Sequence, residues 1–381
     1  MTAPFTLTAP REALLAAVQT AFGAVERRNT IPVLANLLLE SCETGLTVSG
    51  TNLDVMTTVA TGLGCQPKAH AGITVPAALT HDILRKIPQG CEVTLAEGKN
   101  GQMTLTAGRS RFQLSTLPAA DWPKLEDKSG ALETRFSLTA ARFAAMLAGV
   151  DFAISTEETR YYLNGVYMHE LGGSLITVAT DGHRLARAVL AGVADAEGMP
   201  GVIIPARTVD LVSKALAAAP KDAVLDIAVS ENRVTFETGA VRIASKLIDG
   251  TFPDYPRVIP EGGANRWRFD VAALGEAVDR VSTISSERGR AVKMGWGRDT
   301  LDLTVVNPDA GDGREDMSVE AEDGEDVEIG FNAKYLAQML AHMTGRATVT
   351  MAGPGAPARF APVHQEHEAI EMTFVLMPMR V

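Results

Sequence analysis

PAALTHDILRKI, at residues 76–87, is one of six similar segments that together decide the fold. Each segment follows a short extended run, begins after a proline or a helix-capping residue, and repeats apolar residues at helical spacing. The other five start after Thr8, Thr139, Pro205, Asp270 and Asn332, and they read APREALLAAVQTAF, AARFAAMLAGV, ARTVDLVSKAL, VAALGEAVDRV and AKYLAQMLAHM. Successive segments start 62 to 68 residues apart. This regular spacing predicts six repeated units, each built around one helix.

The residues between the helical segments alternate apolar and polar side chains, which predicts short strands. NLLLESCE, GLTVSGTN and VMTTVATGL follow the first helix, and EVTLAEG, QMTLTAG and SRFQLSTL follow the second. Each unit is therefore expected to contain one helix and about four strands, in the order βαβββ.

A second period, twice as long, groups the units in pairs. Asp121-Trp122-Pro123 returns 133 residues later as Asp254-Tyr255-Pro256, and GRSRFQLSTL at 108–117 has a counterpart in GAVRIASKLI at 239–248. The segments 121–131 and 252–264 are rich in proline, glycine and charge, as domain boundaries commonly are. We therefore expect an α+β protein of three similar domains, at 1–124, 125–253 and 254–381.

Antiparallel sheets of this size leave unpaired edge strands, which invite pairing with a neighbouring domain. Consecutive domains should then form an arc, and such an arc either ends in capped units or closes through a heterologous contact. Neither end of this chain carries an obvious polar cap. The sequence therefore favours a closed assembly.

The composition fits a folded protein of several domains. A chain of 381 residues is too long for one hydrophobic core, and 46% apolar with 21% charged residues is typical of globular proteins. We find no targeting signal and no apolar run long enough to cross a membrane, so we expect the protein in the cytoplasm. Cys42, Cys65 and Cys91 lack metal-binding spacing and are expected to be reduced, buried thiols.

Charge is unevenly distributed along the chain. The whole chain carries −11, whereas the six helical segments together carry +5, which leaves −16 for the rest. One interpretation is that basic residues such as Arg85 and Lys86 favour the carboxyl ends of helices. The other places all six helices on one surface facing a polyanion, with acidic strands turned outward. Such a weakly basic surface suits sliding along DNA better than gripping it.

Simple geometry sets the size of a ring lined by helices. Neighbouring helices pack roughly 10 Å apart and are about 10 Å wide, so six enclose a hole of about 9 Å and twelve a hole of about 28 Å. Duplex DNA, roughly 20 Å wide, fits only the larger hole. Two head-to-tail copies of the chain are therefore the smallest ring that surrounds a duplex.

Catalytic and metal sites are weakly indicated. Asp181 and His183 in DGHR suggest acid/base chemistry, but no nucleophile motif accompanies them, and a turn histidine explains them better. His364 and His367 have metal-ligand spacing without an evident third ligand. The sequence shows no P-loop and no dinucleotide-binding glycine motif. We predict a protein without catalytic activity, metal or cofactor; a hydrolase that uses His183 is the weaker alternative.

Several longer stretches resemble a known family in the right order: NTIPVLANLLLE, GRSRFQLSTLPAADWP, TRYYLNGVYM, TVATDGHRLA, SKLIDGTFPDYPRVIP, EIGFNAKYL and VLMPMRV. Over essentially its full length the chain is similar to the bacterial sliding clamps, the beta subunits of DNA polymerase III. The resemblance implies the DNA clamp fold, with helices lining a central pore and sheets outside, and a head-to-tail dimeric ring. It also implies a processivity factor that encircles duplex DNA and binds the replicative polymerase alpha subunit, other polymerases, the clamp loader and repair proteins.

In this family a cleft between the second and third domains accepts a short apolar peptide from each partner. Carried over by motif, the cleft comprises Leu163, Thr180, Gly182, His183, Arg184, Leu185, Pro253, Arg257, Val258, Val375, Leu376, Met377, Pro378, Met379 and Arg380. Methionines adapt to varied partners, and apolar anchors in a concave pocket concentrate binding energy. The alternative is that the leucines simply pack within strands.

For DNA the resemblance points to Arg28, Arg85, Arg160, Tyr161, Tyr162 and Arg207. Arginine pairs with phosphate and tyrosine stacks on an exposed base, although tyrosines also fill domain cores. The chain departs from better-known members at Ala78 and Leu79, where basic residues are frequent, and at Glu157, which adds a negative charge. DNA contacts are therefore expected to be weaker or differently placed.

Ring closure in relatives uses the strand in GRSRF and a helix end of the third domain. Here this implies Arg109, Arg111 and Phe112 against Ile284. Burial of one aromatic side chain such as Phe112 contributes roughly 1.5 to 3 kcal/mol. The alternatives are that Phe112 is an ordinary core residue, and that the whole chain is a repeat scaffold that binds proteins without encircling DNA.

Overall fold

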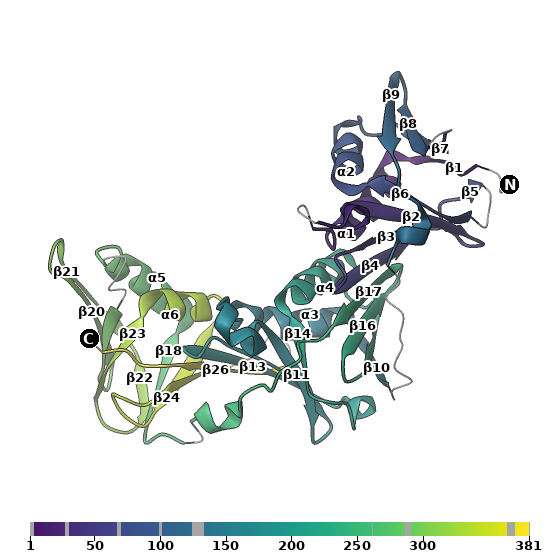
Figure 1. Ribbon diagram of the computed structural model, residues 1–381. Coiled ribbons are helices and arrows are strands. Elements are labelled where there is room, and N and C mark those ends of the chain that lie inside the picture. Colours follow the sequence, from purple (N-terminus) through teal and green to yellow (C-terminus); the bar gives the residue numbers. More distant parts are fainter. Residues whose placement is uncertain are drawn as a thin grey trace. The chain divides into compact units, whose positions relative to one another are not determined.

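The computed structural model describes residues 4–26, 30–66, 70–98, 101–123, 133–260, 262–285, 291–363 and 370–380. The chain divides into two compact units (Figure 1). Unit 1 comprises Met1–Ala141 and Asp210–Leu247, and unit 2 comprises Arg142–Val209 and Ile248–Val381. The predicted central domain therefore contributes residues to both units.

All six predicted helices are present among the described residues: α1 (Arg11–Phe22), α2 (Ala77–Lys86), α3 (Ala140–Ala148), α4 (Ala206–Ala218), α5 (Val271–Ser282) and α6 (Ala333–Leu340). Helix α1 begins later than predicted, because the residues before it pair as strand β1 (Thr6–Pro10). The predicted caps of the last two helices are confirmed. Asp270 accepts a hydrogen bond from the Ala273 amide at 2.8 Å, and Asn332 accepts from the Lys334 amide at 3.0 Å.

Short 3-10 helices mark several of the connections. They are η1 (Pro32–Ala35), η2 (Ala119–Asp121), η3 (Asp151–Ala153), η4 (Glu158–Leu163), η5 (Ala194–Ala196) and η6 (Tyr255–Val258). The repeated Asp-aromatic-Pro motif falls at or beside η2 and η6, so both copies occupy equivalent turns.

Unit 1 holds two antiparallel sheets. One has the order β5 (Cys65–Gln66), β1, β7 (Glu92–Glu97), β8 (Gln102–Ala107) and β9 (Ser110–Ser115). The other has the order β10 (Thr134–Thr139), β15 (Val224–Val229), β16 (Arg233–Thr238), β17 (Val241–Lys246), β4 (Val55–Ala60), β3 (Gly45–Thr51), β2 (Asn36–Cys42) and β6 (His70–Pro76). The β17–β4 pair joins strands predicted in two different domains.

Helices α1 and α2 pack against these sheets through a continuous apolar core. Leu14 and Val18 of α1 and Leu84 of α2 are at most 1% exposed, as are the strand residues Leu37 and Val48. The apolar residues of the helical repeat thus face the core, as their spacing predicts.

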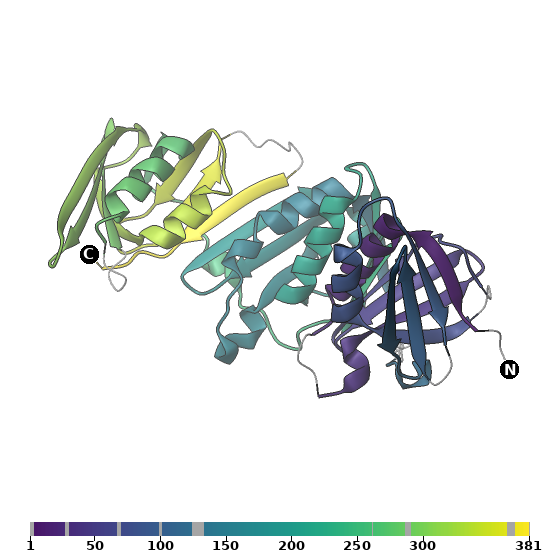
Figure 2. The same cartoon turned by 90° about the horizontal axis from the view of Figure 1, so that it is seen from above.

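Unit 2 also holds two antiparallel sheets. The larger has the order β14 (Val202–Pro205), β11 (Gly165–Leu171), β12 (Ser174–Thr180), β13 (Arg184–Ala191), β26 (Ile370–Leu376), β25 (Ala358–Pro362), β24 (Arg346–Met351), β18 (Asn265–Asp270) and β22 (Glu320–Asp323). The smaller has the order β21 (Gly311–Ser318), β20 (Thr300–Asn307), β19 (Ala291–Trp296) and β23 (Val327–Asn332). Helices α5 and α6 lie side by side (Figure 2), over a core that includes Trp267, Trp296 and Phe331.

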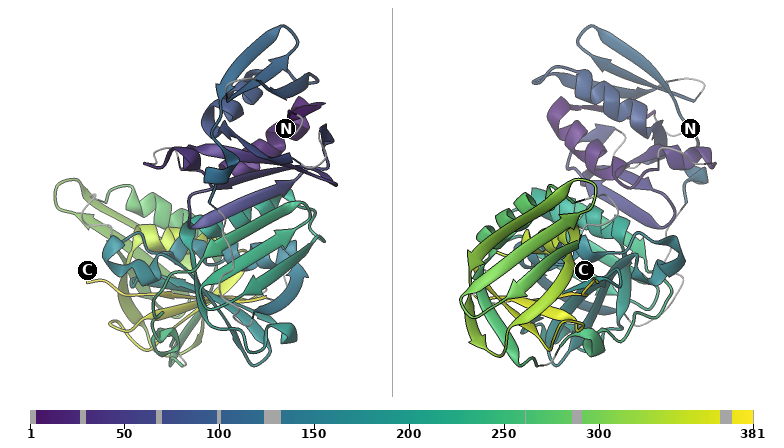
Figure 3. Two further views of the ribbon diagram at one scale, coloured as in Figure 1. Left: turned by 45° about the vertical axis from the view of Figure 1, so that its right-hand side comes forward. Right: turned by 90° about the vertical axis from the view of Figure 1, so that its left-hand side faces the viewer.

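Two of the terminal strands among the described residues matter for assembly. Strand β9 ends the five-stranded sheet of unit 1, and β21 ends the four-stranded sheet of unit 2. Figure 3 shows β20 and β21 as a long green hairpin. The side chains of both edge strands are largely exposed.

One expectation about the cysteines is wrong. The three thiols are free and Cys65 is buried, but Cys91 is only half-buried, and Cys42 is exposed because it ends β2 at the hairpin that leads into β3. Its Sγ lies 3.1 Å from Oγ1 of Thr44, and this hydrogen bond lowers the pKa of the thiol. No helix in the described part of the chain has the length and apolar character needed to cross a membrane.

Gly50 on β3 allows α1 to approach the sheet closely. A Cβ at this position would collide with the carbonyl oxygen of Ala21 and lie 3.1 Å from Cγ2 of Val25. We expect Gly50→Ala to lower the free energy of unfolding by about 2 kcal/mol, because the helix must move away. Gly295→Ala is the matched strand control, since its Cβ would meet Asp302 at an ordinary 3.6 Å. Urea unfolding that shows equal stability for both variants would contradict this account.

Candidate functional site

A cavity of about 290 Å³ opens in unit 2 where β12, β13 and β26 meet. It is lined by Arg160, Tyr162, Leu163, Thr180, Gly182, Arg184, Leu185, Pro253, Asp254, Tyr255, Val258, Val375 and Met377. We call this cavity the cleft. Its lining is mainly apolar with a few charged groups, a composition typical of sites that bind small ligands or peptide side chains.

The floor of the cleft is one face of the sheet. Leu185 on β13 lies directly opposite Val375 on β26 and opposite Thr180 on β12. Because side chains alternate along a strand, the neighbouring Leu376 points to the other face and is fully buried there. Leu163, at the end of η4, packs with Leu185 and Val375 in one apolar cluster.

One wall of the cleft is formed by residues 253–258, and the residue before them packs on the sheet. The ring of Phe252 stacks on that of Tyr167, with centroids 4.8 Å apart and planes 6° apart. Tyr255 is 7% exposed, whereas Val258 is 45% exposed. The wall thus has a buried aromatic anchor and an apolar side chain left open to a ligand.

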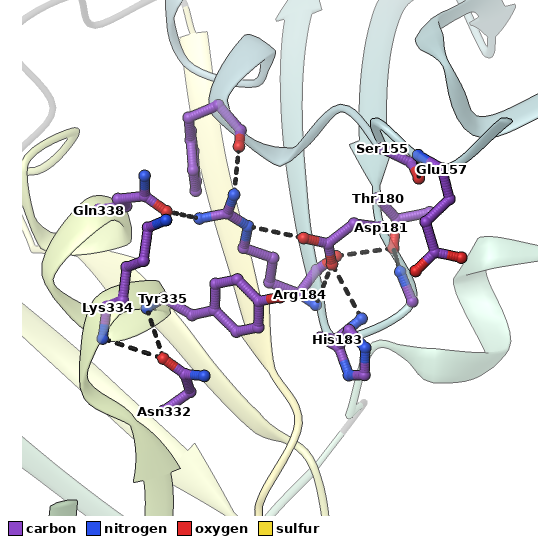
Figure 4. A network of polar contacts seen from close by, with 12 residues as sticks. Ser155, Glu157, Thr180, Asp181, His183, Arg184, Asn332, Lys334, Tyr335 and Gln338 are labelled. Atoms are coloured by element: carbon purple, nitrogen blue, oxygen red, sulfur yellow. Dashed lines mark hydrogen bonds and ion pairs between the residues drawn. The ribbon is translucent and has the colours of Figure 1, made fainter. Parts of the chain in front are cut away.

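A tight turn between β12 and β13 forms the end of the cleft (Figure 4). The Asp181 carboxylate accepts hydrogen bonds from the amides of His183 and Arg184, at 2.9 and 3.0 Å. Gly182 has a φ of +87°, and a Cβ there would lie 2.6 Å from Nη1 of Arg160. The carboxylate is therefore occupied in holding the turn, which accounts for the DGHR motif without catalysis.

Arg184 is the polar centre of this region, although only 8% of it is exposed. Its guanidinium donates to Asp181 at 3.1 Å, to Gln338 on α6 at 2.6 Å and to the Phe152 carbonyl at 2.6 Å (Figure 4). It also lies over the ring of Tyr335, 4.7 Å from the centroid. Arg184 therefore ties β13 to η3 and α6 beneath the cleft.

The tail that follows β26 is held by backbone hydrogen bonds. The Met377 amide donates to the His183 carbonyl at 2.9 Å, and the Met379 amide donates to the Gly330 carbonyl at 2.9 Å. Met377 is 40% exposed, so its side chain is available to a ligand at the cleft. His183 itself stacks against Tyr335, with ring centroids 5.8 Å apart.

The structure brings together most, but not all, of the residues predicted for the cleft. Leu163, Thr180, Gly182, Arg184, Leu185, Pro253, Val258, Val375 and Met377 line it. His183, Arg257, Leu376, Pro378, Met379 and Arg380 do not. Sequence reasoning missed Asp254 and Tyr255, although their return as a copy of Asp121-Trp122 was a usable signal.

The residues predicted to contact DNA are placed in different surroundings. Arg28 lies outside the described residues. Arg85 and Arg207 are exposed, at the end of α2 and the start of α4 respectively. Tyr161 is 53% exposed, whereas Tyr162 packs on the apolar cluster of the cleft.

Arg160 lines the cleft and forms an ion pair with Glu157, with Nη2 and Oε1 2.6 Å apart. This hydrogen-bonded pair lowers the pKa of Glu157 and raises that of Arg160. Glu157 therefore neutralises Arg160 locally instead of standing as a separate negative charge.

The residues predicted for ring closure lie at β9 and beside β21. Arg109, Arg111 and Phe112 are exposed at β9, and the Phe112 side chain is 37% exposed, which excludes an ordinary core position. Ile284 follows α5 and lies beside β21. Its methyl carbons are 3.6 and 3.4 Å from where a Cβ would stand on Gly311 and Gly313.

Unit 1 contains a wider hollow, of about 750 Å³, on the corresponding strands. Trp122 and Leu38 form its apolar end, but Glu40, Thr47, Ser49 and Thr58 line its sheet face. This polar lining makes it a poorer match to an apolar ligand than the cleft of unit 2. Among the described residues no cluster of three or more His, Cys, Asp or Glu side chains could hold a metal, and His364 and His367 lie outside them.

Comparison with known proteins gives a consistent result along the whole chain. Models of the DNA polymerase III beta subunit match in order: its N-terminal domain at residues 5–126, its central domain at 137–254 and its C-terminal domain at 256–380. The beta sliding clamp of Caulobacter vibrioides is 42% identical over 382 residues, which is 98% of this chain and 100% of that protein.

Solved structures agree. A DnaN sliding clamp from Bartonella birtlesii, bound to griselimycin, is 38% identical with a TM-score of 0.92, and the match covers 100% of both chains. The Caulobacter crescentus beta sliding clamp, solved with bound PEG, is 40% identical with a TM-score of 0.92, again over 100% of both chains.

Removing Arg184 should damage the region beneath the cleft. We expect Arg184→Ala to lower the free energy of unfolding by about 3 kcal/mol, because Asp181, Gln338 and a buried carbonyl lose their donor together. Arg257→Ala is the control, since Arg257 also pairs with an aspartate but its side chain is 83% exposed. Equal urea midpoints for the two variants would show that the Arg184 network contributes no stability.

Proposed function

Because the chain belongs to the family of DNA polymerase III beta subunits, the bacterial sliding clamps, we propose that it is a non-catalytic processivity factor. It would work in the cytoplasm, as a ring of two chains that encircles duplex DNA and tethers the replicative polymerase to it. The observation that carries this proposal is the match of three successive clamp domains over nearly the whole chain, combined with the cleft. We also propose domain boundaries at 1–124, 125–253 and 254–381.

Closure of the ring is supported by a pairing rule visible twice in the structure. Strand β4 pairs antiparallel with β17, and β13 pairs antiparallel with β26, each joining strands of successive proposed domains. Strand β9 is the sequence counterpart of β17. Strand β21 is the third strand after α5, just as β4 is the third strand after α1 and β13 the third after α3. A third pairing of the same kind, β21 of one chain with β9 of a second, would close a head-to-tail dimer.

The side chains at these edges suit such a joint. Phe112 lies opposite Leu105 on β8 and so faces the core side of its sheet. Gly311 and Gly313 on β21 leave space above Ile284. Pairing of the two edges would let the ring of Phe112 reach Ile284 over these glycines, burying apolar surface on both sides.

The cleft is proposed to bind a short apolar peptide segment of each partner. Candidate partners are the polymerase alpha subunit, other polymerases, the clamp loader and repair proteins. Leu163, Leu185 and Val375 offer a preformed apolar floor, while Val258 and Met377 add exposed apolar side chains at its rim. An apolar side chain inserted there would be desolvated on several sides, which concentrates binding energy in few contacts.

DNA contact is proposed to be weak and independent of sequence. Arg28, Arg85, Arg160, Tyr161, Tyr162 and Arg207 remain the candidate contacts. Arg160 would contribute less than its charge suggests, because Glu157 already pairs with it. A clamp that slides needs few phosphate contacts, since each one adds to affinity and to the salt dependence of binding.

Topological binding can be tested by loading the protein onto a nicked plasmid with clamp loader and ATP. We expect retention on the circle during gel filtration and release after the plasmid is cut, because a ring slides off free ends. Phe112→Asp should lower retention on the circle at least tenfold by weakening the dimer, and sedimentation should show monomers. Retention on cut DNA with open ends would favour ordinary binding, and failure to associate with the circle would favour a protein-only scaffold.

Peptide binding can be tested with a fluorescein-labelled peptide that carries the clamp-binding segment of a polymerase alpha subunit. We expect Met377→Asp to raise the Kd at least tenfold, because a charge would stand at the apolar rim. Val306→Asp is the matched control, since Val306 is 69% exposed in the same unit but outside the cleft. Griselimycin serves as a competitor. Unchanged binding by Met377→Asp would rule out the cleft as the peptide site.

A further inference from the structure

A hydrogen bond between two side chains anchors the wall of the cleft to the sheet. The hydroxyl of Tyr255 in η6 lies 2.8 Å from Nε2 of His169 on β11. The two rings are tilted toward one another, with centroids 5.8 Å apart. Both side chains are largely buried, so the contact is shielded from competing water.

The neighbours of His169 fix the direction of this hydrogen bond. Nδ1 lies 3.2 Å from the Glu170 carbonyl, which can only accept, so Nδ1 carries the proton. Nε2 is then the acceptor, and Tyr255 donates to it. The positive charge of Arg187 on β13 acts on both groups, in the direction that lowers the pKa of Tyr255 and of His169. The hydroxyl of Tyr255 therefore donates to Nε2 of His169.

The surroundings of His169 favour its neutral form. Burial lowers the pKa of His169, and the positive charge of Arg187 lowers it further, while Glu170 acts in the opposite direction. Burial raises the pKa of Tyr255 and of Tyr167, whose ring faces His169 at 5.0 Å between centroids. A proton on Nε2 would reverse the direction of the hydrogen bond and add a partly buried positive charge near that of Arg187, which disfavours this arrangement.

The corresponding strands of unit 1 lack this contact. Register pairs Leu38 with Ser49 on β2 and β3, as it pairs Tyr167 with Val178 on β11 and β12. Two residues further along, Glu40 occupies the place of His169, and Trp122 occupies that of Tyr255 in the repeated motif. Tryptophan has no hydroxyl, so the His169–Tyr255 bond belongs to the copy of this wall that borders the cleft.

We propose that His169 is a positioning residue of the peptide cleft: by accepting the hydroxyl proton of Tyr255, it holds the 253–258 wall where a bound apolar peptide meets it. Tyr255 and Val258 line the cleft from one side, and Leu163 and Val375 line it from the other. Loss of the bond frees the wall to move relative to the floor. This inference rests on the proposed peptide-binding function.

The test measures the Kd of the labelled alpha-subunit peptide at pH 7.5 and pH 5.5. Tyr255→Phe removes one oxygen and keeps the ring, and we expect it to weaken binding about fivefold at pH 7.5, the effect of one lost buried hydrogen bond. His169→Phe should weaken binding by a similar factor. The double variant should bind no worse than either single variant, because both remove the same contact.

Three further readouts separate positioning from packing. His169→Gln, whose amide also accepts a hydrogen bond, should recover part of the lost affinity. The unchanged protein should lose affinity at pH 5.5, as His169 takes up a proton below its ordinary range, and Tyr255→Phe should lose less. His81→Phe, a buried-ring control in unit 1, should bind like the unchanged protein at both pH values.

The outcomes distinguish this inference from the function on which it rests. If Met377→Asp weakens binding while Tyr255→Phe and His169→Phe bind normally at both pH values, the cleft binds peptide and the positioning role is wrong. Additive losses in the double variant would also overturn it. If Met377→Asp has no effect either, the peptide-binding function itself fails. The melting temperature of each variant is measured as well, so that a higher Kd is attributed to a folded protein.

Discussion

The backbone pairing of β13 with β26 is the constraint from which the cleft follows. It aligns Arg184–Leu190 with Ile370–Leu376, segments that lie far apart in the chain. Because register in a sheet fixes which side chains share a face, this pairing places Leu185 beside Val375 and sends Leu376 into the core. A shift of one residue would exchange the apolar floor for the opposite set of side chains. Arg184 is buried at the first residue pair of this register, opposite Leu376, and its guanidinium donates a hydrogen bond to Gln338 on α6.

The same kind of strand pairing occurs once in each unit. At β4–β17 and at β13–β26, an edge strand of one proposed domain pairs with an edge strand of the next, so no edge is exposed there. The edges β9 and β21 are the remaining members of this series among the described strands. In the proposed dimer, these two edges would form a third pairing of the same kind.

The two copies of the repeated strands differ in the side chains on the face that the Asp-aromatic-Pro motif covers. The sheet face beneath Trp122 carries Thr47, Ser49 and Thr58, whereas the equivalent face in unit 2 carries Ile176, Val178 and Arg187. Ile176 and Val178 belong with Tyr255 to one apolar cluster, so this face is more apolar than its counterpart in unit 1. Two arginines that line the cleft already have partners within the fold. Arg184 donates a hydrogen bond to Gln338, and Arg160 forms an ion pair with Glu157. Positive charge close to the cleft therefore serves to hold the fold.

Local patterns were sufficient to predict the six helices, their caps at Asp270 and Asn332, the alternation of the strands and the internal repeat. These features depend on residues close together in the chain, whose spacing and capping chemistry act over one or two turns. The family resemblance added most of the cleft, including Leu163, Leu185 and Val375. The strand register, the burial of Arg184, the inclusion of Tyr255 and Arg160 in the cleft and the exclusion of Leu376 and Met379 from it came from the folded chain. They depend on which distant segments pack together, and side-chain direction is set by that packing, which no stretch of sequence encodes locally.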